Sequence, residues 1–154
     1  MVYIQIETMP KLEFSMDLSS PMEKLVVIAT NYENYEKLLS PQVKSVKIIE
    51  KTENGTLTEE VFHFSSLFSY DIVQKSFHKK IQENKLETEI ITGPFKGTVL
   101  QVSFSGVDSM TKVSVFADVK IQLKYKVLTP VIKKYYRTVL MGLLYKMDNI
   151  ASQS

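Results

Sequence analysis

The chain has 154 residues, no cysteine, 44% hydrophobic and 23% charged residues, and a net charge of +2 at pH 7. This length predicts a single domain over residues 1–154 with a sizeable core. The missing cysteines exclude disulfides and thiolate metal sites. Residues 1–10 lack the pattern of a secretory signal, and no apolar run approaches the roughly 20 residues that span a bilayer, so we expect a cytoplasmic protein.

The first predicted elements are a strand and two short helices. Residues 11–18 alternate between apolar and polar side chains, which predicts a half-buried strand, and residues 1–9 are a candidate extension of the sheet edge. Ser20 is predicted to cap a first helix through a capping box. Residues 33–39 are typical of a second short helix, which ends before Pro41 because the residue ahead of a proline resists helical geometry.

A long run of strands follows the helices. Turn signals such as Asn54-Gly55 and Gly93-Pro94 separate them. The apolar alternation of Val73, Phe77 and Ile81 places His78 on the opposite face of its strand. The predicted strands cover residues 43–53, 56–68, 70–82, 86–92, 95–107 and 112–124.

The chain ends in one long predicted helix over residues 129–150. Thr129 is predicted to cap it, Pro130 suits its first position, and apolar residues recur at helical spacing as far as Met147. Strands joined by tight turns pair antiparallel, and a sheet of about seven twisted strands curls. Only the last helix is long enough to cover the concave face. The fold class is therefore α+β, a helix-grip fold; periodicity leaves open whether its interior is a packed core or a cavity.

The sequence resembles the START-like superfamily of polyketide cyclases and dehydrases, and within it the coenzyme Q-binding START-like proteins. The resemblance covers residues 11–150, and the motifs that carry it are residues 20–25 (SPMEKL), 31–38 (NYENYEKL), 43–50 (VKSVKIIE) and 93–96 (GPFK). It implies the helix-grip fold and the binding of lipids, quinones or polyketides in a cavity between the sheet and the last helix.

We therefore expect a protein that binds or transports an apolar small molecule. Two alternatives remain open: an enzyme resembling a cyclase or dehydratase, and a protein-interaction module with a packed interior. The candidate ligand-binding residues share period-two or helical spacing on the faces predicted to point inward. They are Phe14, Tyr35, Phe62, Phe64, Phe95, Leu100, Val102, Phe104, Val115, Ala117, Tyr136, Leu140 and Leu144.

Catalytic and metal chemistry find little support in the sequence. The only histidines, His63 and His78, are predicted to face outward, so we expect no metal site and no cofactor. The paired acids at Glu59-Glu60 and at Glu87 and Glu89 are assigned to solvated faces. The inward faces then carry tyrosines as their main titratable groups, and a phenol is a weak base at neutral pH. No catalytic residue is assigned.

Positive charge is concentrated at the C-terminal end. Residues 119–154 carry six lysines, Arg137 and a single acid, Asp148. One interpretation is a solvated basic face; the other is peripheral contact with an anionic membrane. No aromatic platform accompanies these residues, so we expect no nucleic-acid partner.

Overall fold

A computed structural model describes residues 11–63 and 71–153 of the chain. The candidate edge extension at residues 1–9 lies outside the described residues. The elements in chain order are β1 (Lys11–Leu18), α2 (Met22–Ala29), η1 (Tyr32–Asn34), α3 (Tyr35–Leu38), β2 (Val43–Thr52), β3 (Gly55–His63), β4 (Asp71–Gln82), β5 (Lys85–Ile90), β6 (Val99–Val107), β7 (Met110–Asp118), η2 (Leu123–Leu128) and α4 (Thr129–Ser152).

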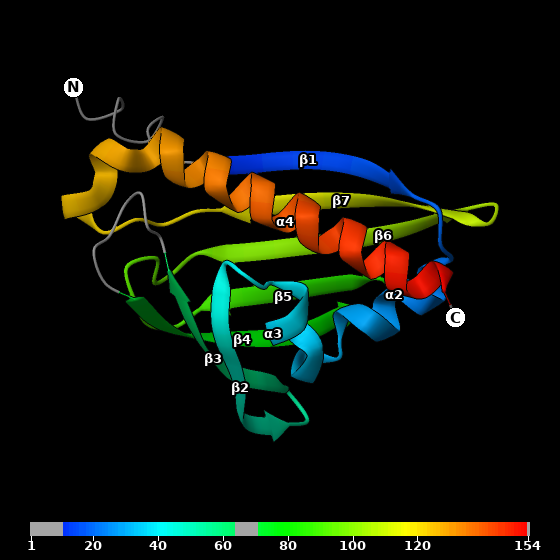
Figure 1. The fold of residues 1–154 in the computed structure, drawn as a ribbon, viewed down its shortest axis with the longest axis horizontal. Helices are drawn as coiled ribbons and strands as arrows, with labels where there is room; N and C mark the ends of the chain where they lie inside the picture. The colour runs from blue at the N-terminus through cyan, green and yellow to red at the C-terminus, as the bar shows by residue number, and fades with distance from the viewer. Residues whose placement is uncertain (1–10, 64–70, 154) are drawn as a thin grey trace.

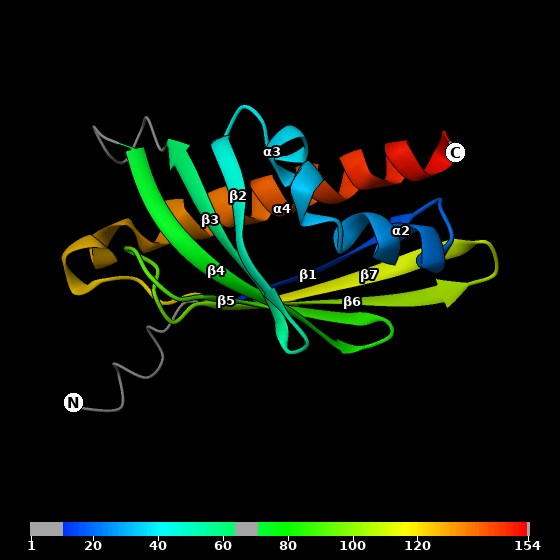
Figure 2. The ribbon, with the colours of Figure 1, turned by 90° about the horizontal axis from the view of Figure 1, so that it is seen from below.

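The strands form one sheet of seven, in the order β1-β7-β6-β5-β4-β3-β2, and every neighbouring pair is antiparallel. Among the strands of the described residues, only the β1–β7 contact joins strands that are distant in sequence. The sheet curves around α4, which crosses its concave face, while α2 and α3 lie on the same side near one end (Figures 1 and 2). The predicted α+β helix-grip fold is confirmed.

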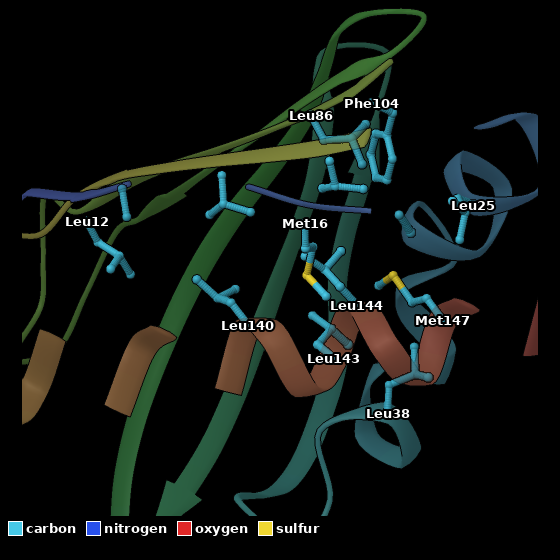
Figure 3. Packing of buried hydrophobic residues seen from close by; sticks show 14 of the residues in the cluster. Leu12, Met16, Leu25, Leu38, Leu86, Phe104, Leu140, Leu143, Leu144 and Met147 are labelled. Atoms are coloured by element: carbon cyan, nitrogen blue, oxygen red, sulfur yellow. The ribbon is translucent and has the colours of Figure 1, made fainter. Parts of the chain in front are cut away.

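The long helix α4 is held to the sheet by its apolar stripe. Leu140, Leu143, Leu144 and Met147 are buried and point toward the sheet, where they meet side chains such as Phe104 (Figure 3). Their spacing of three and four residues brings them onto one face of the helix, so the predicted pattern and the observed contact agree.

The predicted helix caps are wrong. Ser20 does not cap α2, whose N-cap is Pro21 without a side-chain hydrogen bond. The Ser20 amide instead donates to Asp148 Oδ1 at 2.9 Å, and the Ser20 hydroxyl donates to the Asp148 carbonyl oxygen at 3.2 Å. Thr129 is the first residue of α4 rather than its cap, and its hydroxyl donates to the Lys126 carbonyl oxygen. A tertiary contact to α4 has replaced the local capping interaction of Ser20.

The last strand is shorter than predicted. β7 ends at Asp118, where its neighbour β6 begins with Val99, so the chain beyond that point has no β6 residue to pair with. The next segment is held by the Thr98 hydroxyl, which accepts from the Lys120 amide at 2.9 Å and donates to the Lys120 carbonyl oxygen at 3.2 Å. Val119 remains buried although it is outside the strand.

Candidate functional site

Two adjoining chambers lie between the concave face of the sheet and α4. The larger has a volume of about 150 Å³ and the smaller of about 60 Å³. Side chains common to both walls are Tyr35, Thr88, Leu100, Leu140 and Leu143. Because the two chambers share these side chains, they lie next to one another, and residues of α4 line both.

Most of the predicted ligand-binding residues face this interior. Three of them line both chambers: Tyr35, Leu100 and Leu140. Four line only the smaller chamber: Val102, Phe104, Val115 and Leu144. Two line only the larger chamber: Phe62 and Tyr136. Their role in ligand binding stays a prediction.

Three of the predicted residues lie elsewhere, and a fourth cannot be placed. Phe64 is outside the described residues. Phe14 lines neither chamber, and its ring lies 5.6 Å from the Arg137 guanidinium. Phe95 and Ala117 are fully buried but also line neither chamber. These two residues belong to the packed wall around the space rather than to its surface.

The wall of the larger chamber also contains a polar cluster that the sequence analysis missed. Cross-strand pairing aligns Glu60 with Gln74 and Thr58 with Ser76, so these side chains share one face of β3 and β4. Glu60, Gln74 and Ser76 line the larger chamber. The assignment of Glu60 to a solvated face is therefore wrong. The predicted inward orientation of Phe62 already indicated that Glu60 faces inward, because residues two apart on a strand point the same way.

His78 belongs to the same cluster, and its predicted outward orientation is wrong. It is buried, whereas Val73 and Ile81 on the same strand are 53% and 42% exposed. Its ring stacks on Tyr32 with centroids 4.3 Å apart. His63 is exposed as predicted, and its Nδ1 lies 2.9 Å from Asp71 Oδ1. The inward face of β4 thus carries Gln74, Ser76 and His78 next to the buried Ile72.

A chain of hydrogen bonds connects Glu60 to the shared wall of the chambers. The Thr58 hydroxyl donates to Glu60 Oε2 at 2.9 Å, and His78 Nε2 lies 2.8 Å from the same hydroxyl oxygen. Because the Thr58 hydroxyl donates its hydrogen bond to Glu60, it can only accept from His78. The hydrogen of the neutral imidazole therefore lies on Nε2. His78 Nδ1 then accepts from the Thr88 hydroxyl at 2.7 Å.

Burial governs the ionisation of both titratable groups in the cluster. It raises the pKa of Glu60, although hydrogen bonds from Ser76, Thr58 and Gln74 partly offset this rise by stabilising the carboxylate. Burial lowers the pKa of His78 to about 4, so the imidazole is neutral at pH 7. Burial likewise raises the pKa of Tyr136, which keeps that phenol protonated.

The low pKa of His78 predicts a loss of stability in acid. Above pH 6.5 the imidazole is neutral in both the folded and the unfolded chain. As the pH falls from 6.5 toward 4, the unfolded chain binds a proton that the folded chain does not, so the free energy of unfolding decreases. Between pH 7 and pH 4.5 the expected loss from this group is about 2 kcal/mol, since each pKa unit corresponds to about 1.4 kcal/mol and pH 4.5 is still above the folded-state pKa. Urea unfolding at pH 7 and pH 4.5 measures it.

Carboxyl groups also titrate in this range, so the histidine contribution needs a direct control. The chain has two histidines, and proton NMR can follow both imidazoles through a pH titration. A His63→Gln variant assigns the signals. We expect the His78 signal to titrate near pH 4; a midpoint close to the ordinary 6.5 would contradict the buried, neutral imidazole.

Within residues 11–63 and 71–153, no group of three or more histidine, cysteine, aspartate or glutamate side chains could hold a metal ion. The cluster at Glu60 offers hydrogen bonding and proton transfer from its own side chains. Its carboxyl group can accept a proton or a hydrogen bond inside an otherwise apolar space.

The comparisons with known proteins concern both sequence and fold. A family model described as polyketide cyclase/dehydrase and lipid transport matches residues 19–148. No curated protein matches the chain in sequence.

Solved structures with the same fold come from bacteria and plants. A START superfamily protein from Mycobacterium smegmatis is 18% identical with a TM-score of 0.75, and the match covers 93% of this chain and 97% of that one. The Zhui aromatase/cyclase from Streptomyces sp. R1128 is 9% identical with a TM-score of 0.77, covering 90% and 93%. Norcoclaurine synthase from Thalictrum flavum, in complex with dopamine and hydroxybenzaldehyde, is 11% identical with a TM-score of 0.69, covering 90% and 85%.

Proposed function

Because the chain belongs to the family of polyketide cyclases, dehydrases and lipid-transport proteins, we propose that it binds or transports an apolar small molecule between the sheet and α4. The observation that carries this proposal is the larger chamber, about 150 Å³ in volume and lined mainly by apolar side chains. Small-molecule sites are typically concave, apolar and equipped with a few polar groups that orient the ligand.

The size of the chambers supports this proposal over a packed interaction module. An apolar cavity of about 150 Å³ inside a protein is large enough to bind benzene. The larger chamber of this protein has a similar volume and adjoins the smaller one. A single aromatic ring, or the end of a longer apolar chain, therefore fits without rearrangement of the wall.

Native mass spectrometry of the purified protein tests the proposal. We expect a bound apolar compound that is released on denaturation and can be identified after solvent extraction. Protein purified without a ligand should bind added p-xylene at one saturable site. Protein that carries no compound and shows no saturable binding of p-xylene would contradict the proposed function.

An enzyme resembling a cyclase or dehydratase is the second candidate, and the Glu60 cluster favours it. An inward-facing carboxyl group whose pKa is raised by burial suits general acid–base chemistry. Incubation of the protein with the compound extracted from it tests this candidate. A dehydratase would remove one water from that compound, and a Glu60→Gln variant would not.

A protein that transports an apolar compound must also take it up somewhere. The segment η2 and the first turn of α4 have the properties of a membrane-binding edge. Leu123 and Val127 are 83% and 85% exposed, and Val131 is 47% exposed. Lys124 and Lys126 are exposed between them. Aliphatic side chains spaced four residues apart among lysines suit insertion into an anionic phospholipid surface.

The charge around this edge supports an anionic membrane as its occupant. No acidic residue occurs between residues 119 and 147, so little in the neighbouring sequence neutralises the lysines. Tyr135 and Tyr136, which line the larger chamber, lie one turn of α4 beyond Val131. Among the described residues, no helix is long and apolar enough to cross a bilayer, and the proposed contact is peripheral.

A charge-reversal variant tests the membrane contact. Lys124→Glu combined with Lys126→Glu should weaken binding to phosphatidylglycerol vesicles by at least about thirtyfold, since each basic residue contributes about 1 kcal/mol. Vesicle co-sedimentation measures the effect. The matched control, Lys37→Glu with Lys47→Glu, makes the same change of charge at exposed positions elsewhere. Equal loss of binding in both variants would indicate a response to net charge and contradict a specific edge.

A further inference from the structure

We propose that Glu60 and Gln74 form a subsite that binds the hydroxyl group of an otherwise apolar ligand, such as a phenol or an alcohol. The inference rests on the proposed function and specifies its ligand class. Both side chains lie in the wall of the larger chamber, on adjacent strands and at directly paired positions.

The first observation is an unused acceptor. Among the described residues, Gln74 Oε1 is one of the buried side-chain atoms that has no hydrogen-bond partner, and Gln74 itself is 8% exposed. Buried polar atoms in folded proteins are nearly always paired, so an unpaired atom in a chamber wall indicates a missing partner. A hydroxyl group on a bound ligand would supply the hydrogen that this oxygen lacks.

The orientation of the Gln74 amide follows from its neighbours. Its nitrogen donates to Glu60 Oε1 at 3.3 Å and to Ser76 Oγ at 3.4 Å. Turning the amide over would place its oxygen against the Glu60 carboxylate, where two acceptors would repel one another. The free atom is therefore the oxygen, and the ligand must provide the donor.

The second observation is that four of the chamber's hydroxyl groups are already used as donors. The Ser76 hydroxyl donates to Glu60 Oε1 at 2.5 Å and the Thr88 hydroxyl to His78. The Thr98 hydroxyl donates to the Lys120 carbonyl oxygen, and the Tyr35 hydroxyl to the Ala29 carbonyl oxygen. These groups leave the wall rich in acceptors. Tyr135 and Tyr136 also line the chamber, and the Tyr136 hydroxyl can donate to the oxygen of the bound group.

The apolar part of the chamber wall indicates that the rest of the ligand is a hydrocarbon. Val43, Phe62, Ile90, Leu140 and Leu143 line the same chamber and offer only apolar contact. A ligand would therefore place its single hydroxyl against β3 and β4 and its hydrocarbon part against α4. A carboxylate ligand lacks a proton to donate and would be repelled by Glu60 when that group is ionised.

A matched pair of probes tests the subsite. In p-cresol and p-xylene a hydroxyl and a methyl group of similar size occupy the same position. In the wild-type protein we expect p-cresol to bind about tenfold more tightly than p-xylene, as a hydrogen bond from the ligand to a charged or buried acceptor predicts. NMR titration of the protein measures both dissociation constants.

Three variants distinguish recognition of the hydroxyl group at the subsite from binding of an apolar ring in the chamber. Glu60→Gln and Gln74→Met should lower the preference for p-cresol and leave p-xylene binding largely unchanged. Glu59→Gln is the matched control, because Glu59 adjoins Glu60 in the chain but points to the other face of β3. Thermal unfolding of each variant identifies any that fails to fold. If Glu60→Gln does not fold, Gln74→Met still tests the subsite.

The possible failures are distinguishable. If both probes bind and neither Glu60→Gln nor Gln74→Met changes the preference, the subsite is wrong while the proposed function stands. If no compound co-purifies with the wild-type protein and neither probe binds to it, the proposed function fails, and the subsite fails with it.

Discussion

Replacement of Leu100 with tryptophan is expected to abolish binding of p-xylene while the protein stays folded. Leu100 lies on β6, is partly buried and lines both chambers. The larger indole ring would occupy the space that the ligand needs, and the existing cavity would spare the fold most of the cost of overpacking. Ligand titration and urea unfolding together measure the two effects.

Ala117→Trp is the matched control because Ala117 is the cross-strand partner of Leu100 on β7. Ala117 is 1% exposed and lines neither chamber. A tryptophan there has no void to fill, so we expect it to destabilise the protein by about 1–3 kcal/mol or more. If Leu100→Trp binds p-xylene as tightly as the wild type does, the ligand does not occupy these chambers.

Truncation of Phe95 to alanine is expected to cause a large loss of stability. Phe95 is fully buried, and its ring lies 6.4 Å from that of Phe62 and 5.6 Å from that of Tyr136. It connects the loop before β6 with both β3 and α4. Phenylalanine-to-alanine changes in packed cores cost about 3–5 kcal/mol, because apolar contact is lost and a cavity remains. Urea unfolding measures the difference.

The adjacent Lys96 provides the control, since its side chain is exposed. Lys96→Ala should change the free energy of unfolding by no more than about 0.5 kcal/mol. A loss of less than about 1 kcal/mol for Phe95→Ala would mean that the loop before β6 does not contribute to the core as its burial implies.

Sequence alone was sufficient for the architecture. Turn signals such as Asn54-Gly55 between alternating segments dictate antiparallel neighbours, and a helical stripe that ends at Met147 requires an apolar surface to cover. These features are local and repeated, so errors at single residues do not change the result. The predicted end of the last strand failed because a strand needs a partner, and β6 begins only at Val99.

The site depended on which face of each strand points inward, and only the tertiary structure decided that. Alternation along β4 separates Val73 and Ile81 from Gln74 and His78, but it does not say which set is buried. Hydrophobicity favoured the first set, and the structure buries the second. The reason is cooperative: His78 and the amide nitrogen of Gln74 meet hydrogen-bonding partners on β3 and β5, and paired polar groups can be buried at little cost. Those partners come together only when the sheet forms.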